Sequence, residues 1–142
     1  MKVLVSRLKA FAPLKERLQV LVVDDEEANR EWLAHVLEPA GFDVLSASSG
    51  KRAIALARSR NPDLVLLDLM MPEVNGFDVV EALRTYESTR NTPILILTAA
   101  ALSERDKQKL NGQVSDILSR GKVGSAVIVD HLRAVAGQNG AR

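Results

Sequence analysis

The sequence of 142 residues contains no cysteine and no long apolar run. The absence of cysteine excludes a disulfide scaffold, a thiol nucleophile and any metal site built on thiolates. No apolar run approaches the roughly 20 residues that a membrane span needs. The first residues, MKVLVSRLKAFAPLKERLQ, are too polar for a secretory signal. These absences favour a cytoplasmic protein.

The charge is small overall but unevenly distributed. The net charge is +1, and 46% of the residues are hydrophobic, which is typical of one globular domain. Residues 1–18 hold five of the 19 basic groups and one of the 18 acidic groups, so 14 basic and 17 acidic groups remain for the rest. We expect a basic leader or linker over 1–18, a folded domain over 19–136 and a flexible tail over 137–142. The mildly acidic body offers no nucleic-acid face, and a solvated leader is favoured over one that binds an anionic partner.

Short apolar runs and helical patterns alternate five times from residue 19 onward. Apolar runs with β-branched residues predict buried strands, and apolar residues three and four apart predict helices. The predicted strands are 19–23, 43–47, 64–67, 93–98 and 115–119. The predicted helices are one from Glu26 that ends at Pro39 and Gly41, and others over 49–60, 76–86, 103–112 and 125–137. For the last helix we expect Ser125 as the N-cap and Gly137 as the stop.

These strands are apolar on both faces and separated by helices, which predicts a parallel sheet covered on both sides. The fold class is therefore α/β: a single doubly wound five-stranded parallel sheet with helices on both faces, of the flavodoxin-like kind. In the first helix, Trp32, Leu33, Val36 and Leu37 have helical spacing. This spacing favours a core position for Trp32 over a place on a docking surface.

Polar side chains follow the strands, where a doubly wound fold places its working site. Three carboxylates, a hydroxyl and two basic groups lie there: Asp24, Asp25, Asp68, Thr98, Arg120 and Lys122. Close carboxylates repel one another unless a cation lies between them, and a hard divalent cation such as Mg²⁺ prefers oxygen ligands. The two histidines, His35 and His131, lie in predicted helices, so zinc or a redox metal is disfavoured.

Asp68 ends an apolar strand, where a carboxylate needs compensation of its charge. Carboxylates act as nucleophiles in proteins that form an aspartyl phosphate, and Asp68 fits that role. Thr98 would donate a hydrogen bond to one phosphoryl oxygen, and the basic side chain would pair with another. The alternative, that these acids are helix caps and turn residues, is weakened because the features follow successive strands.

Three segments carry a resemblance to a known family: VVDDEEANR after the first strand, LLDLMMPEVNG around Asp68, and ILTAA around Thr98. Over residues 19–136 the chain resembles the receiver domain of two-component response regulators. The segment LNGQVSDILSRG is similar to the receivers found at the carboxyl end of hybrid sensor kinases.

The resemblance implies a role for each matching residue. Asp68 would be the phosphorylation site, and Thr98 the hydroxyl that closes on the phosphoryl group. Asp25 would bind Mg²⁺ directly, Asp24 mainly through water, and Met70 through its backbone carbonyl. The spacings agree with the family, with 43 residues from Asp25 to Asp68 and 30 from Asp68 to Thr98.

The last predicted strand departs from the family pattern. Arg120 stands where the family has a lysine, and Lys122 is the alternative partner for the phosphoryl group. Ile117 stands where a switching aromatic residue is usual, and Gly121 where a proline is common. The usual coupling of Thr98 to an aromatic residue is therefore not carried over to this chain.

The resemblance implies a signalling domain in a two-component phosphorelay, not a metabolic enzyme. Asp68 would take a phosphoryl group from a histidine kinase or a histidine phosphotransfer protein, switch protein contacts, and later lose inorganic phosphate. No direct contact with nucleic acid or membrane is expected, and a weak homodimer is left open. One rival is a pseudo-receiver that binds proteins without phosphorylation. Another is a magnesium phosphohydrolase, which usually needs a second acid where Met70 stands.

Overall fold

A computed structural model describes the backbone of residues 17–140 and the side chains of residues 17–136. The leader predicted over residues 1–18 lies outside this range except for its last two residues. Arg17 holds the start of the domain, because its Nε donates a hydrogen bond to Oδ1 of Asp43 at 2.7 Å. The second of these two leader residues, Leu18, already belongs to the first strand.

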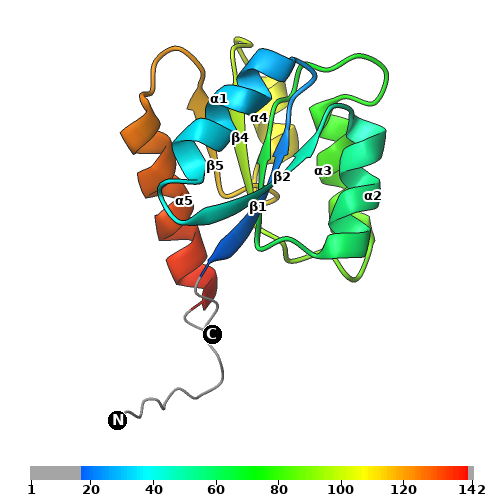
Figure 1. Ribbon diagram of the computed structural model, residues 1–142. Coiled ribbons are helices and arrows are strands. Elements are labelled where there is room, and N and C mark those ends of the chain that lie inside the picture. Colours follow the sequence, from blue (N-terminus) through cyan, green and yellow to red (C-terminus); the bar gives the residue numbers. More distant parts are fainter. Residues whose placement is uncertain (1–16, 141–142) are drawn as a thin grey trace.

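The described residues form one parallel sheet with the strand order β2-β1-β3-β4-β5 (Figure 1). The strands are β1 Leu18–Val23, β2 Phe42–Ala47, β3 Leu64–Leu67, β4 Ile94–Thr98 and β5 Asp116–Ser119. The order reverses beside β1, since the chain moves to β2 on one side and then returns to β3 on the other. The predicted doubly wound, flavodoxin-like α/β fold is confirmed.

Five helices cover the two faces of this sheet within the described residues. They are α1 Glu27–Leu37, α2 Gly50–Arg60, α3 Gly76–Thr85, α4 Glu104–Leu110 and α5 Ser125–Gly140. One face carries α1 and α5, and the other carries α2, α3 and α4 (Figure 1). No described helix is both long and apolar enough to cross a membrane.

The strands are buried on both faces, as their sequence predicts. In β1, Leu21 and Val23 pack on the side of α2 and α3, whereas Val20 and Val22 pack on the side of α1 and α5. Since successive side chains of a strand point to opposite faces, a continuous apolar run supplies both cores at once. The polar residues that follow each strand are thereby left at the edge of the sheet.

Capping boxes fix where two of the helices begin. Asn75 accepts a hydrogen bond from the Asp78 N–H at 3.1 Å, and Asp78 in return accepts one from the Asn75 N–H. Ser103 and Asp106 form the same reciprocal pair at the start of α4. Such capping boxes satisfy backbone donors that have no partner inside the helix. They also set the ends of the two loops that flank the acidic edge of the sheet.

Two predictions for the last helix are wrong. Ser125 is its first residue and not its N-cap, because the Ile128 N–H donates to the carbonyl oxygen of Gly124. The helix also continues through Gly137 to Gly140, so the predicted tail is helical over 137–140. A glycine inside a helix costs only about 1 kcal/mol relative to alanine and does not end a helix by itself.

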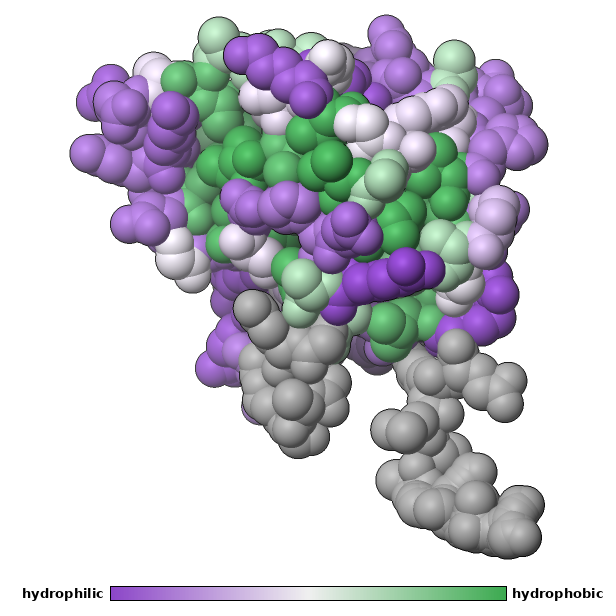
Figure 2. Space-filling view, turned by 90° about the vertical axis from the view of Figure 1, so that its left-hand side faces the viewer, coloured by the Kyte–Doolittle hydropathy of each residue, from purple (hydrophilic) through white to green (hydrophobic). Residues whose placement is uncertain are grey.

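The predicted core position of Trp32 is also wrong. Leu33 and Leu37 of α1 are buried, but Trp32 is 45% exposed. Successive helical residues are about 100° apart, so Trp32 is turned away from the face that Leu33 presents to the sheet. Figure 2 shows one face of the molecule, on which apolar surface lies among hydrophilic side chains. Val127 of α5 is a further large apolar residue that is exposed.

Candidate functional site

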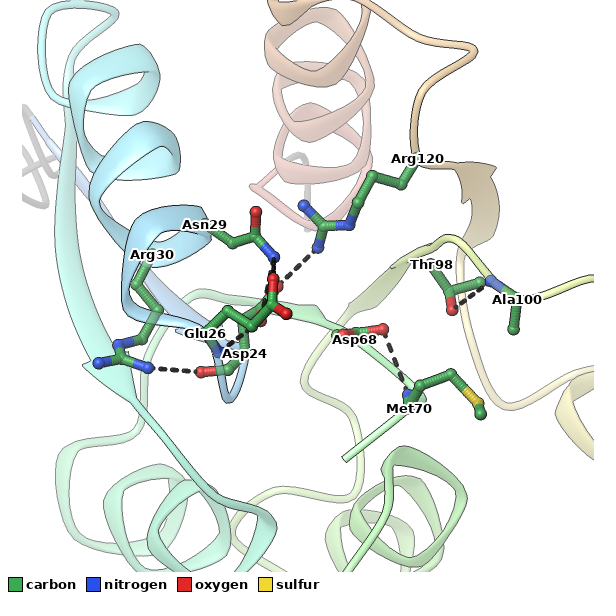
Figure 3. A network of polar contacts seen from close by, with 9 residues as sticks. All are labelled: Asp24, Glu26, Asn29, Arg30, Asp68, Met70, Thr98, Ala100 and Arg120. Atoms are coloured by element: carbon green, nitrogen blue, oxygen red, sulfur yellow. Dashed lines mark hydrogen bonds and ion pairs between the residues drawn. The ribbon is translucent and has the colours of Figure 1, made fainter. Parts of the chain in front are cut away.

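Three carboxylates gather at the point where the strand order reverses. Asp24 and Asp25 follow β1, and Asp68 follows the neighbouring strand β3. The Asp68 N–H donates to the carbonyl oxygen of Val23 at 3.0 Å, which holds the two strand ends together. One oxygen from each carboxylate lies within 4.8 Å of the others. The structure thus brings together the three acids that follow β1 and β3 in the sequence. Figure 3 shows two of them, Asp24 and Asp68, at this edge of the sheet.

Asp24 is the buried member of this group, with 1% of its surface exposed. Its Oδ1 accepts hydrogen bonds from the Glu26 N–H at 2.9 Å and from Nδ2 of Asn29 at 3.4 Å. Its Oδ2 lies 2.7 Å from Nη2 of Arg120 (Figure 3). A buried carboxylate requires both hydrogen bonds and a compensating charge, and Asp24 has both.

The placement of Arg120 follows from the backbone after β5. Its N–H donates to the carbonyl oxygen of Thr98 at 2.8 Å, which continues the pairing of β4 with β5. Gly121 follows with φ +88°, a left-handed conformation that glycine adopts without strain. The turn leaves Lys122 exposed. Of the two predicted basic residues, Arg120 is therefore the one that reaches the carboxylates.

Asp68 is partly buried at the floor of the site, and several neighbours act on its pKa. Burial raises the pKa above its usual value of 3.8, and repulsion from Asp24 acts in the same direction. The Met70 N–H, which donates to Oδ1 at 3.2 Å, lowers the pKa, as do Arg120 and the Thr98 hydroxyl. The first effect is the largest, so the net pKa is raised. Burial therefore makes the charged form of Asp68 less favourable in the folded protein than in water.

Thr98 ends β4 with 2% of its surface exposed. Its Oγ1 accepts a hydrogen bond from the Ala100 N–H at 3.2 Å, which orients the hydroxyl from the backbone side. The same hydroxyl lowers the pKa of Asp68. A buried, oriented hydroxyl beside a carboxylate is suited to contact an oxygen attached to it.

The donor set fits magnesium. Oxygen-only ligands and a surplus of negative charge are what this hard cation prefers, and it tolerates an open site with several bound waters. The histidines do not belong to the acidic group: Nδ1 of His131 pairs with Asp116 at 3.2 Å, and His35 is exposed on α1. The direct contact of Asp25 and of the Met70 carbonyl with the ion stays a prediction.

Sequence reasoning missed two contacts that complete the site. Nη1 of Arg30 donates to the backbone carbonyl of Asp24 at 2.9 Å, and Arg120 binds the Asp24 carboxylate directly. The sequence did hold a signal for the second contact. A buried aspartate at a strand end requires a cation, and Arg120 is the basic residue that follows the last strand. The sequence alone pointed Arg120 only toward a phosphoryl group.

A doubly wound parallel sheet with an acidic, hydroxyl-bearing site at the carboxyl ends of its strands defines a CheY-like α/β domain. The chain belongs to the response regulator receiver domain family, whose model matches residues 20–131. Receiver domains are signalling domains of two-component systems. They interact with histidine kinases and phosphotransfer proteins, and they typically bind Mg²⁺ through an acidic cluster of the kind found here.

Two curated relatives illustrate the similarity in sequence. The chain is 38% identical over 102 residues to the DNA-binding dual master transcriptional regulator RpaA of Synechocystis, covering 72% of this chain and 42% of that protein. It therefore spans about two fifths of the length of RpaA. It is 32% identical over 101 residues to the polar-differentiation response regulator DivK of Brucella ovis, covering 71% of this chain and 82% of DivK.

Solved structures agree with the fold. The chemotaxis response regulator CheY4 of Vibrio cholerae superposes with a TM-score of 0.77 at 31% identity, covering 84% of this chain and 98% of that one. The receiver domain of the sensor histidine kinase PA1611 of Pseudomonas aeruginosa also gives 0.77, at 26% identity, covering 85% and 98%. The PA1611 structure holds a magnesium ion in its active site cleft.

Proposed function

We propose that this domain accepts a phosphoryl group on Asp68 from a phosphohistidine, in a Mg²⁺-dependent reaction that changes its protein contacts. The observation that carries the proposal is the position of Asp68. Its carboxylate lies among two further acids, a buried hydroxyl and a guanidinium at one edge of the sheet. These are the groups that an acyl phosphate and its cation require.

Asp68 is the acid best suited to attack phosphorus. Asp24 is buried, and both of its oxygens are already engaged by other groups. Asp25 is exposed and lies on the same strand end as Asp24. Asp68 is partly buried, and the Met70 N–H holds one of its oxygens, so the carboxylate is oriented before a donor arrives.

The transfer exchanges one bond for another. An Asp68 oxygen attacks the phosphorus, the bond from phosphorus to the imidazole nitrogen breaks, and its electron pair stays on the departing histidine. Magnesium, when bound, supplies positive charge for the phosphoryl oxygens. Asp25, Asp68 and the Met70 carbonyl would hold it directly, and Asp24 would do so through water. Attack of water at phosphorus later restores the carboxylate and releases inorganic phosphate.

Two protein groups would stabilise the phosphoryl oxygens beside the cation. Thr98 would donate a hydrogen bond from its hydroxyl to one of them, since its Oγ1 is already oriented by the Ala100 N–H. Arg120 contributes positive charge from the end of β5, with a planar fork in place of the compact charge of a lysine. Lys122 is the weaker alternative, because it is exposed in the turn.

The partner we propose is a histidine kinase or a histidine phosphotransfer protein in the cytoplasm, with no direct contact with nucleic acid or membrane. The competing function is a pseudo-receiver, which two observations favour. Arg120 is already bound to Asp24. Ile117, which is partly buried against the core, offers no aromatic switch.

Intact mass after incubation with acetyl phosphate and Mg²⁺ tests the proposal. We expect one phosphoryl adduct on the wild-type chain and none on Asp68→Asn or in the presence of EDTA. Asp130→Asn, which removes an exposed acid from α5, serves as the matched control and should give the adduct. A wild-type chain that binds Mg²⁺ but forms no adduct would establish the pseudo-receiver instead.

A further inference from the structure

We infer that Arg120 is an internal counter-cation of the acidic cluster, which competes with Mg²⁺ and sets how tightly the domain binds this ion. The inference rests on the magnesium site of the proposed function and adds a control of its affinity. The guanidinium of Arg120 pairs with the Asp24 carboxylate, so part of the negative charge of the cluster is neutralised by the chain itself.

Asp24 is fully engaged by other groups of the protein. Both of its carboxylate oxygens have protein partners: Oδ1 accepts from Glu26 and Asn29, and Oδ2 accepts from Arg120. The Arg120 contact is a charge-assisted hydrogen bond of 2.7 Å to a residue that is 1% exposed. Such a bond is among the stronger ones in proteins, because little water screens it.

Arg120 is held in this position by its backbone and by the turn after β5. Its backbone is held by the bond to the Thr98 carbonyl, and its side chain is 22% exposed as it crosses from β5 to the end of β1 (Figure 3). Arg30 also approaches Asp24, but it binds the backbone carbonyl and not the carboxylate. Among the hydrogen bonds and ion pairs of the described residues, Arg120 therefore supplies the positive charge on the Asp24 carboxylate.

The net charge of the cluster governs its attraction for Mg²⁺. Three carboxylates and one guanidinium leave two negative charges, so Mg²⁺ entering among the oxygens experiences repulsion from Arg120. Removing the guanidinium has two opposite effects. It leaves Asp24 buried without a cation, which destabilises the metal-free protein, and it raises the attraction of the cluster for Mg²⁺. A residue with only a structural role would produce the first effect alone.

Mg²⁺ binding measured by calorimetry, together with the metal-free melting temperature, tests the inference in Arg120→Met. We expect about threefold to tenfold tighter Mg²⁺ binding and a lower metal-free melting temperature. Arg60→Met is the matched control: it removes the same charge from the exposed end of α2, and it should leave Mg²⁺ binding unchanged. Equal or weaker Mg²⁺ binding by Arg120→Met would overturn the inference.

If Arg120→Met does not fold without metal, Arg120→Gln takes its place. Its amide retains a donor and loses the charge, so tighter Mg²⁺ binding is again expected. The phosphoryl adduct separates this inference from the proposed function. An adduct on the wild type with unchanged Mg²⁺ affinity in both Arg120 variants rejects the inference alone. Tighter Mg²⁺ binding by the Arg120 variants, with no adduct on the wild type, rejects phosphorylation and supports the role of Arg120.

Discussion

Arg84 of α3 donates a hydrogen bond from Nε to the carbonyl oxygen of Gln113, 2.9 Å away and 29 residues later in the chain. Its Nη1 donates to the carbonyl oxygens of Thr89 and Arg90 at 3.2 and 2.9 Å. One guanidinium thus joins the loop before β4 to the turn between α4 and β5. Burial lowers the pKa of Arg84, but an arginine remains charged at physiological pH.

Arg84→Lys should loosen the turn before β5. A lysine carries one compact group and cannot donate to both loops with the geometry of the fork. We expect amide hydrogen exchange over residues 111–115 to become at least about tenfold faster, while the exchange of β1 and β3 stays unchanged. Arg58→Lys is the control. The Arg58 guanidinium stacks on the Tyr86 ring, 3.8 Å from its centroid, so the same change there should leave the exchange of residues 111–115 unaltered. Unchanged exchange in this turn would show that Arg84 does not hold it.

Thr89→Val should destabilise the domain because it removes a buried hydroxyl that donates to backbone carbonyl oxygens. Thr89 is fully buried, and its hydroxyl donates to the carbonyl oxygen of Leu83 at 2.7 Å. Valine has the same shape but no donor, so the free energy of unfolding should fall by about 1–3 kcal/mol in urea titrations. Thr85→Val removes a similar bond to Glu81 at an exposed position and should change it by less than about 0.5 kcal/mol. Equal losses of unfolding free energy in both variants would show that burial of the hydroxyl does not matter.

Gly50→Ala should strain the contact between α2 and the loop that follows Asp68. A Cβ atom at Gly50 would lie 2.3 Å from the carbonyl oxygen of Val74 and 2.7 Å from its Cγ1. The backbone must shift to admit it, and we expect the free energy of unfolding to fall by about 1–3 kcal/mol in urea. Gly124→Ser is the control, since a Cβ there meets no atom within 4 Å. A neutral effect at Gly50 would mean that the loop moves aside freely.

The strands and the acidic cluster could be predicted because both depend on local pattern. Runs such as LVLL are apolar on both faces, and a doubly wound fold brings the residues after its strands to one edge. The expected cluster of carboxylates is therefore present, formed by Asp24, Asp25 and Asp68. The family pattern also agreed with this edge, which is why the chemistry of Asp68 could be proposed before any contact was known.

The contacts that escaped prediction depend on exact three-dimensional placement. Arg120 and Asp24 are 96 residues apart, and their pairing depends on how the turn after β5 aims one long side chain. The same holds for Arg84, whose acceptors are backbone carbonyls that no residue type reveals. The end of α5 was missed because a glycine weakens a helix without ending it, so Gly137 did not mark the boundary.

Asp68→Asn should stabilise the metal-free protein at neutral pH, although it removes the proposed phosphorylation site. Burial raises the pKa of Asp68 in the folded state above its usual value of 3.8, so the folded protein holds this proton more tightly than the unfolded chain. Stability is then lost as the pH rises from about 3.8 through the folded pKa, because the folded state must accept a charge that it disfavours. Asparagine carries no such charge, and its carbonyl can still accept from the Met70 N–H.

The melting temperature measured with and without Mg²⁺ from pH 4 to pH 7.5 decides whether this explanation holds. In EDTA, the advantage of Asp68→Asn over the wild type should be larger at pH 7.5 than at pH 4. Added Mg²⁺ should then raise the melting temperature of the wild type more than that of the variant, because the variant lacks one carboxylate ligand. An advantage that does not depend on pH would assign the effect to packing. An advantage that Mg²⁺ leaves unchanged would show that Asp68 does not bind the ion.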